Sequence, residues 1–197
     1  MVDILIGLFI ATLITELFST RIYKLIGWYA LNSLILGSIA TYIGFSKMDT
    51  EMIITGILTM FIKFLIIPYI LKYFIIKHKI KRQIISSIKI HYSVIIIPMV
   101  LVFTFYLITP ILENFEVNSN YIAIATAGMF LSLLLINEFD NLVAKIIGFL
   151  SIENSLFLLG ISATDGMPML IELGIFFDLL MLIIVINLLF KNQGELL

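Results

Sequence analysis

The chain has 197 residues, of which 61% are hydrophobic and 13% are charged, and its net charge is −1. A soluble domain carries about twice that charged fraction, so the composition excludes an ordinary soluble fold and predicts an integral membrane protein. The absence of cysteine excludes disulfides, iron–sulfur clusters and cysteine nucleophiles. Because only two histidines are present, His78 and His91, we expect no bound metal, haem or other cofactor.

Apolar runs of about 17–25 residues are typical of transmembrane helices. Seven such runs follow one another, which predicts an all-α polytopic protein with spans at 2–19, 25–45, 52–74, 91–111, 121–137, 145–162 and 168–190. The first run carries Asp3 and Glu16 with no basic residue ahead of it, so we expect a membrane helix rather than a cleaved signal. Pro68 and Pro98 fall inside the third and fourth runs, where kinks are tolerated, and Pro168 suits the first turn of the last.

Basic residues collect on one side of these seven predicted spans. They follow the first span, fill the connection after the third, open the sixth and follow the seventh: Arg21, Lys24, Lys77, Lys79, Lys81, Arg82, Lys89, Lys145 and Lys191. The opposite side has Lys47 and five acids: Asp49, Glu51, Glu113, Glu116 and Asp165. The positive-inside rule therefore predicts an external N-terminus and a cytoplasmic C-terminus. Residues 77–90 are expected at the cytoplasmic surface, either attracting anionic lipid or docking a cytoplasmic partner.

Four ionisable residues fall well inside the predicted spans, namely Lys63, Glu153, Glu172 and Asp178. Such a residue costs about 2.5–3.5 kcal/mol at a helix centre, and it generally faces the bundle interior. Lys63, Glu153 and Asp178 lie near the centres of their runs, whereas Glu172 lies about one turn from the outer end. Because Lys63 has the depth of these carboxyls, we expect it to be a partner of one of them. A carboxyl near an ammonium can exchange protons, although a purely structural buried pair is the alternative.

Other polar residues in the spans have less costly interpretations. Glu16 lies near the predicted cytoplasmic end of the first span, where we expect it to snorkel and pair with Arg21. Five neutral polar residues are expected to form interhelical hydrogen bonds, with the lining of a hydrated path as the alternative: Asn32, Ser33, Asn154, Ser155 and Asn187.

Several functional classes lack the residues they need. A retinal protein needs a lysine in its last helix, but the seventh predicted span has none. An intramembrane enzyme needs a nucleophile with its base or a metal site, yet no Ser–His pair, aspartyl dyad motif or HExxH occurs. An ion-translocating subunit of a membrane complex, a small secondary transporter and a structural scaffold are the remaining hypotheses. The absence of a convincing internal repeat argues mildly against inverted-repeat transporters. No nucleic acid or soluble small-molecule substrate is expected.

The C-terminal third carries a family resemblance. It lies in the phrase GFLSIENSLFLLG, then DGMP, then a last apolar run with carboxyls, all within residues 141–189. This stretch resembles the hydrogenase-4 component E family, whose members are membrane subunits of group 4 nickel–iron hydrogenases and formate hydrogenlyase complexes. The family's last three helices are similar to the K subunit of respiratory complex I. The resemblance covers residues 121–190, whereas residues 1–120 agree only in the number, length and hydrophobicity of four helices.

The resemblance implies a role and a location. K-type subunits carry glutamates on two consecutive helices in the hydrophilic axis of the membrane arm, and Glu153 matches the first of these by position. Asp178 matches the second by depth, with Glu172 as the other candidate. The implied function is relay of H⁺ or Na⁺ between antiporter-like and hydrogenase-anchoring subunits in the cell membrane of a bacterium or archaeon. Residues 121–197 would then be the K-subunit-like region and residues 1–120 an N-terminal extension.

Overall fold

A computed structural model describes residues 1–77, 79–80, 83–84, 90–112 and 119–164. The regular elements within these ranges are all helices, which confirms the predicted all-α class for this part of the chain. In chain order they are α1 (Val2–Leu17), α2 (Ile22–Lys47), α3 (Thr50–Thr59), η1 (Met60–Ile66), α4 (Ile67–Lys77), α5 (Ile90–Leu112), α6 (Ser119–Glu138) and α7 (Leu142–Thr164).

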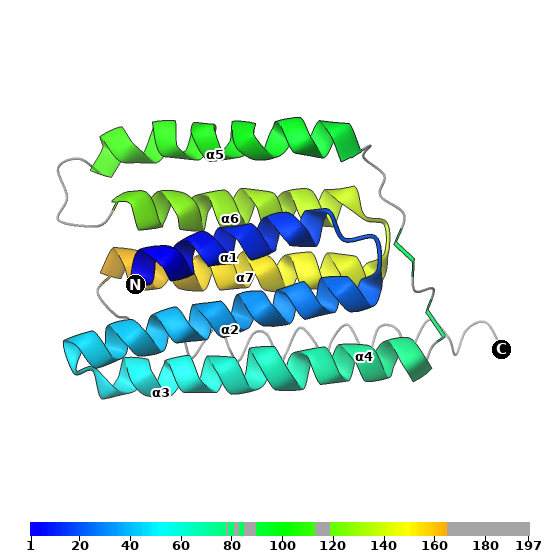
Figure 1. Ribbon diagram of the computed structural model, residues 1–197, viewed down its shortest axis with the longest axis horizontal. Helices are drawn as coiled ribbons and strands as arrows, with labels where there is room; N and C mark the ends of the chain where they lie inside the picture. The colour runs from blue at the N-terminus through cyan, green and yellow to red at the C-terminus, as the bar shows by residue number, and fades with distance from the viewer. Residues whose placement is uncertain (78, 81–82, 85–89, 113–118, 165–197) are drawn as a thin grey trace.

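The helices lie side by side with their axes along the long direction of the molecule (Figure 1). α1 packs against α2 and α6, and α7 packs against the same two helices, so these four form the centre of the bundle. α5 packs on the outside of α6, and the continuous helix α3–η1–α4 packs on the outside of α2. Side chains that point from α1, α2 and α7 toward one another are therefore enclosed by protein.

Within the described part of the chain, five helical stretches are long and apolar enough to cross a membrane: Ile22–Lys47, Thr50–Lys77, Tyr92–Ile111, Asn120–Glu138 and Leu142–Ala163. They match the second to sixth predicted spans, most of them with longer ends. The first predicted span is helical for only 16 residues, about 24 Å of rise against the roughly 30 Å of a hydrocarbon core. The seventh predicted span, 168–190, lies outside the described residues.

Glycines allow α2 and α3 to approach each other closely. A Cβ added to Gly56 would lie 2.8 Å from the backbone nitrogen of Thr41, and one added to Gly37 would lie 2.9 Å from the carbonyl oxygen of Gly56. Both distances are shorter than a carbon can tolerate, so only glycine fits at these positions. Small residues at contacts of this kind are the usual device for bringing membrane helices together.

The third span changes its helical pattern immediately before Pro68. In η1 the backbone is a π-helix, and the N–H of Ile67 donates to the carbonyl of Ile62, five residues earlier. Pro68 has no N–H to offer to the preceding turn, so an ordinary α-helical ladder could not continue unbroken through this position. The sequence suggested a kink at Pro68, and the structure has a π-helical segment immediately before this proline. The segment contains Lys63.

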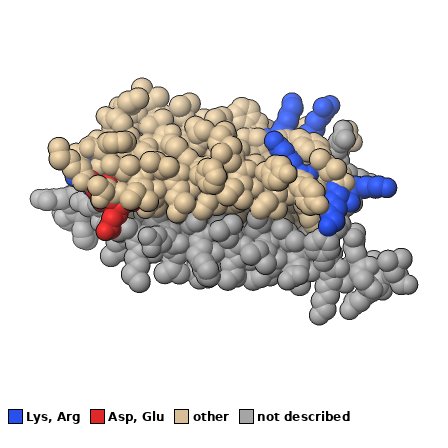
Figure 2. All heavy atoms as spheres, turned by 90° about the horizontal axis from the view of Figure 1, so that it is seen from below, with Lys and Arg blue, Asp and Glu red and all other residues tan. Residues whose placement is uncertain are grey.

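Basic side chains gather at one end of the molecule, as Figure 2 shows on the face in view. The turn between α1 and α2 lies at this end, and it contacts part of the basic segment that follows α4. Arg21 forms an isolated β-bridge with Gln83, and the N–H of Ile84 donates to the carbonyl oxygen of Thr20 at 3.0 Å. Gln83 and Ile84, which belong to the predicted surface segment 77–90, therefore lie against the end of the bundle where the charges are.

Substituting Gly56 with alanine tests the close α2–α3 contact. The added methyl meets backbone atoms of α2, so we expect the helices to separate and the free energy of unfolding to fall by about 1–3 kcal/mol. Thermal unfolding in mild detergent measures the loss. Gly27→Ala is the matched control, because Gly27 is exposed and a Cβ there meets nothing within 4 Å. Equal melting temperatures for the two variants would contradict the contact.

Candidate functional site

An ion pair lies at the middle of two membrane-spanning helices. The ammonium nitrogen of Lys63 is 3.3 Å from Oε1 of Glu153, and the two side chains are 1% and 14% exposed. Lys63 is the fourteenth of the 28 residues in Thr50–Lys77, and Glu153 is the twelfth of the 23 residues in α7. The structure thus brings together the two described members of the predicted intramembrane set, as their equal depth suggested.

Asn154 connects this pair to the centre of the bundle. Its Oδ1 accepts a hydrogen bond from the Lys63 ammonium at 3.2 Å, while its Nδ2 donates to Oδ1 of Asn32 and to Oγ of Ser33, both at 2.9 Å. Asn154, Asn32 and Ser33 have no exposed surface. One amide group therefore uses its acceptor for the cation from η1 and its donors for α2.

The network continues from α2 to α1. Nδ2 of Asn32 donates to Oγ1 of Thr12 at 2.8 Å and to the carbonyl oxygen of Phe9 at 3.1 Å. The interhelical hydrogen bonds predicted for Asn32, Ser33 and Asn154 are confirmed. Ser155 differs, because its hydroxyl donates to the carbonyl of Ser151 in the same helix. Asn187, also predicted to form such bonds, lies outside the described residues.

The prediction for Glu16 was wrong. Glu16 has no exposed surface, and instead of snorkelling toward Arg21 it accepts a hydrogen bond at Oε2 from Oγ of Ser151, at 2.8 Å. Ser151 is nine residues beyond the start of α7, which corresponds to about 13 Å along the helix axis. α1 is short, and its C-terminal end lies inward of the beginning of α7 (Figure 1), so a residue near the end of its own helix is still deep in the bundle.

Glu138 is a further buried carboxyl, which the sequence analysis did not single out because its neighbours in the sequence are polar. The stretch NEFDNL reads as a loop, but α6 continues through Glu138, which is 1% exposed, and Ser93 of α5 donates a hydrogen bond to its Oε1 at 3.3 Å. α7 begins directly afterwards, with the side chain of Asn141 accepting from the N–H of Val143 at 2.9 Å. Because the turn between α6 and α7 is short, Glu138 is the last residue of α6, and α5 covers it there.

The other two predicted relay residues, Glu172 and Asp178, lie outside the described residues. Nothing in the described part of the chain therefore decides between them as the second carboxyl. Within the same part, no three histidine, cysteine, aspartate or glutamate side chains come together as metal ligands.

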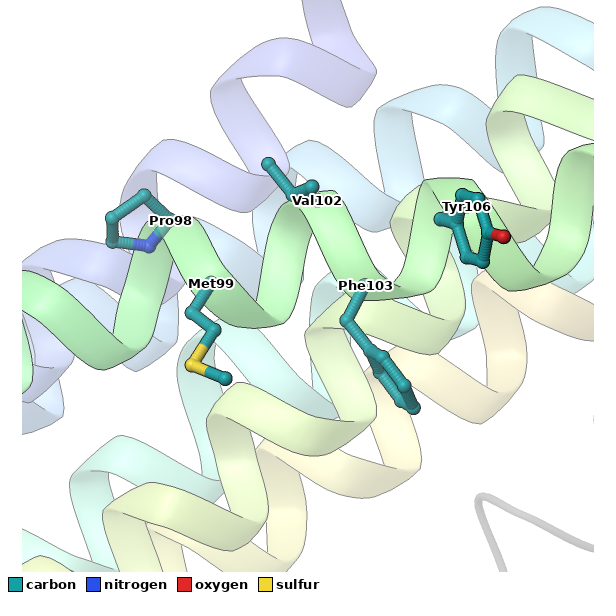
Figure 3. Close-up of a pocket in the computed structure, with 5 residues that line it drawn as sticks. All are labelled: Pro98, Met99, Val102, Phe103 and Tyr106. Carbon is teal, nitrogen blue, oxygen red and sulfur yellow. The ribbon is translucent and has the colours of Figure 1, made fainter.

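The outer face of α5 is apolar and largely uncovered. Only 11% of its apolar window is buried, against 61% for α7, so α5 presents its side chains to lipid or to another membrane protein. A shallow depression on this face is lined by Pro98, Met99, Val102, Phe103 and Tyr106 (Figure 3). This depression offers no charged group, so it does not share the chemistry of the interior network.

Comparisons with protein-family models, with curated proteins and with solved structures find no match for this chain. An ammonium held by a carboxyl and by an amide oxygen can remain hydrogen-bonded when the carboxyl gains a proton, because the amide oxygen still accepts from it.

A double-mutant cycle tests the ion pair. Removing the cation with Lys63→Met leaves a covered carboxylate, so we expect a loss of about 3 kcal/mol in the free energy of unfolding. The further change Glu153→Gln removes that charge, and part of the loss should return. Thermal unfolding in detergent measures the loss of stability in Lys63→Met, in Glu153→Gln and in the double variant. Lys72→Met is the control because Lys72 is exposed on α4 of the same span. Additive effects of the two substitutions would contradict the pairing.

Proposed function

We propose that this chain is an ion-translocating membrane subunit of a complex I-like assembly of the group 4 hydrogenase type. Its task in that assembly is to relay H⁺ or Na⁺ through intramembrane carboxyls, and it holds no redox centre itself. The observation that carries the proposal is the Lys63–Glu153 pair at mid-span, together with the amide of Asn154 that shares the ammonium.

The geometry of the pair supports a relay for a physical reason. Ionising groups in a bilayer are costly and generally mark ion or proton pathways. The side chain of Glu153 is 14% exposed although both of its carboxyl oxygens are buried, whereas the side chain of Lys63 is only 1% exposed. Protonation of Glu153 changes the charge of the site by one unit, and Asn154 retains Lys63 in both states.

A scaffold is the second candidate, and the same network favours it. The hydrogen bonds from Lys63 through Asn154 and Asn32 to Thr12 join four helical elements, which is also how polar residues fix helix packing. In a scaffold the charge of Glu153 never changes, so neutralising it would alter stability and leave ion movement intact. Measurement of ion transfer separates the two functions.

The proposal includes a topology and a location. Seven spans, with α1 and residues 168–190 completing the five long helices, place the N-terminus outside and the C-terminus in the cytoplasm of a bacterial or archaeal cell. The basic end of the bundle is then the cytoplasmic end, where lysine and arginine are retained. Residues 121–197 contact antiporter-like and hydrogenase-anchoring subunits, and Asp178 or Glu172 supplies the second carboxyl.

Replacing Glu153 with glutamine in the assembled complex tests the relay. Glutamine preserves the shape of the side chain but cannot carry the proton, so we expect turnover-driven ion transfer into sealed vesicles to fall to the background rate. Glu51→Gln is the control, because Glu51 is exposed in the first turn of α3. Ion transfer at the unaltered rate in Glu153→Gln vesicles would leave only the scaffold.

Mild solubilisation tests the parent assembly. Because the outer face of α5 is apolar and uncovered, we expect the chain to copurify with larger membrane subunits and with nickel- and iron–sulfur-containing proteins. Native gel mass and metal content measure this. A lone chain that moves a solute across liposomes would instead indicate a secondary transporter.

A further inference from the structure

Glu16 is the one described carboxyl with no exposed surface at all, and the relay through Glu153 does not use it. Its two oxygens have different surroundings. Oε2 accepts the hydrogen bond from Ser151, whereas Oε1 is buried and has no hydrogen-bond partner among the described residues. A buried polar atom in this condition requires an explanation, because such atoms are nearly always satisfied.

A proton on Oε1 would remove the negative charge that these surroundings do not balance. A buried carboxylate needs a cation or several donors to offset its desolvation, and a single hydroxyl is too little. Glu16 makes no ion pair with any described residue. On α2, α6 and α7, the buried polar residues are neutral apart from Glu138, which is itself acidic: Asn32, Ser33, Ser132, Ser151, Asn154 and Ser155. In the protonated form, Oε1 carries the hydrogen and Oε2 is the carbonyl oxygen that Ser151 bonds.

The same face of α7 connects Glu16 with the central pair. Ser151, Asn154 and Ser155 are spaced three and four residues apart, so they lie on one side of the helix. Ser151 contacts the Glu16 carboxyl, and Asn154, about 4.5 Å further along the axis, contacts Lys63. Thr12, one turn before Glu16 on α1, accepts from Asn32, which is bonded in turn to Asn154. Glu16 thus borders the hydrogen-bonded network rather than a separate part of the core.

We propose that Glu16, held by Ser151, is a further proton-binding carboxyl that exchanges its proton with Glu153, a role that rests on the relay proposed above. In one half of the cycle the Glu16 carboxylate takes a proton from a hydronium ion, forming an O–H bond at Oε1 and leaving water. In the other half this bond breaks, and the proton passes through water to the ionised carboxylate of Glu153, which later releases it to water as hydronium, so that both groups return to their starting charges. One carboxyl is neutralised as the other becomes charged, so the two sites together hold one transferable proton.

Infrared spectroscopy of the full chain in lipid tests the bound proton without any activity. A protonated carboxyl has a carbonyl stretching band that is absent from carboxylates. We expect Glu16→Gln to remove one such band and Glu51→Gln, the exposed control, to remove none. Ser151→Ala should move the same band to higher frequency, because the hydrogen bond to the carbonyl oxygen is lost. A carboxyl spectrum unchanged in Glu16→Gln would overturn the proposal, and if that variant does not fold, an unshifted band in Ser151→Ala would do so.

Ion transfer in the assembled complex tests the exchange with Glu153. We expect Glu16→Gln to reduce turnover-driven ion transfer to background, as Glu153→Gln does, while Glu51→Gln transfers ions at the unaltered rate. Full transfer in Glu16→Gln with loss in Glu153→Gln would overturn the role of Glu16 alone and leave the relay in place. Full transfer in both variants would overturn the relay itself, whatever the infrared spectrum of Glu16 shows.

Discussion

The constraint on which this bundle depends is that an ammonium at the centre of a membrane helix must have partners. Lys63 is enclosed at the midpoint of its span, where an unpaired charge would cost several kcal/mol. It is held by Glu153 and by the amide oxygen of Asn154, both from α7. Because these partners lie on consecutive residues, the rotation of α7 about its axis is determined by the position of one lysine on η1.

The remaining packing adapts to this rotation of α7. With Asn154 turned toward Lys63, Ser151 faces α1 and Ser155 faces α6. A Cβ at Gly128 of α6 would lie 2.6 Å from the Ser155 hydroxyl, and one at Gly148 of α7 would lie 3.2 Å from the backbone nitrogen of Ile136. Glycine at both positions lets α6 and α7 approach closely around polar side chains. Polar contacts thus orient the helices, and glycine contacts bring them to packing distance.

Composition and hydropathy were sufficient to predict the membrane class and the positions of five spans, because both depend on local sequence. They also suggested a carboxyl partner for Lys63, since depth can be counted along a helix. The position of Glu16 could not be counted in this way, because α1 is shorter than a bilayer is thick and its offset against α7 is a tertiary property. A signal was present in the four-residue spacing of Thr12 and Glu16, which places both on one face. Asn32 and Asn154 could be recognised as hydrogen-bonding residues, but which helices they join depends on packing order.

The π-helical segment sets how the two halves of the third span are rotated about their common axis. A π-turn accommodates one residue more than an α-turn, so η1 corresponds to a single-residue insertion in an otherwise α-helical stretch. Such an insertion rotates everything on one side of it by about 100° relative to the other side. In η1 that rotation separates the glycine contact at Gly56, on α3, from the proline-containing helix α4 that follows. With one residue fewer in this segment, the helix would be equally apolar. If Gly56 and Lys63 still faced the bundle, however, α4 would be rotated away from its present orientation.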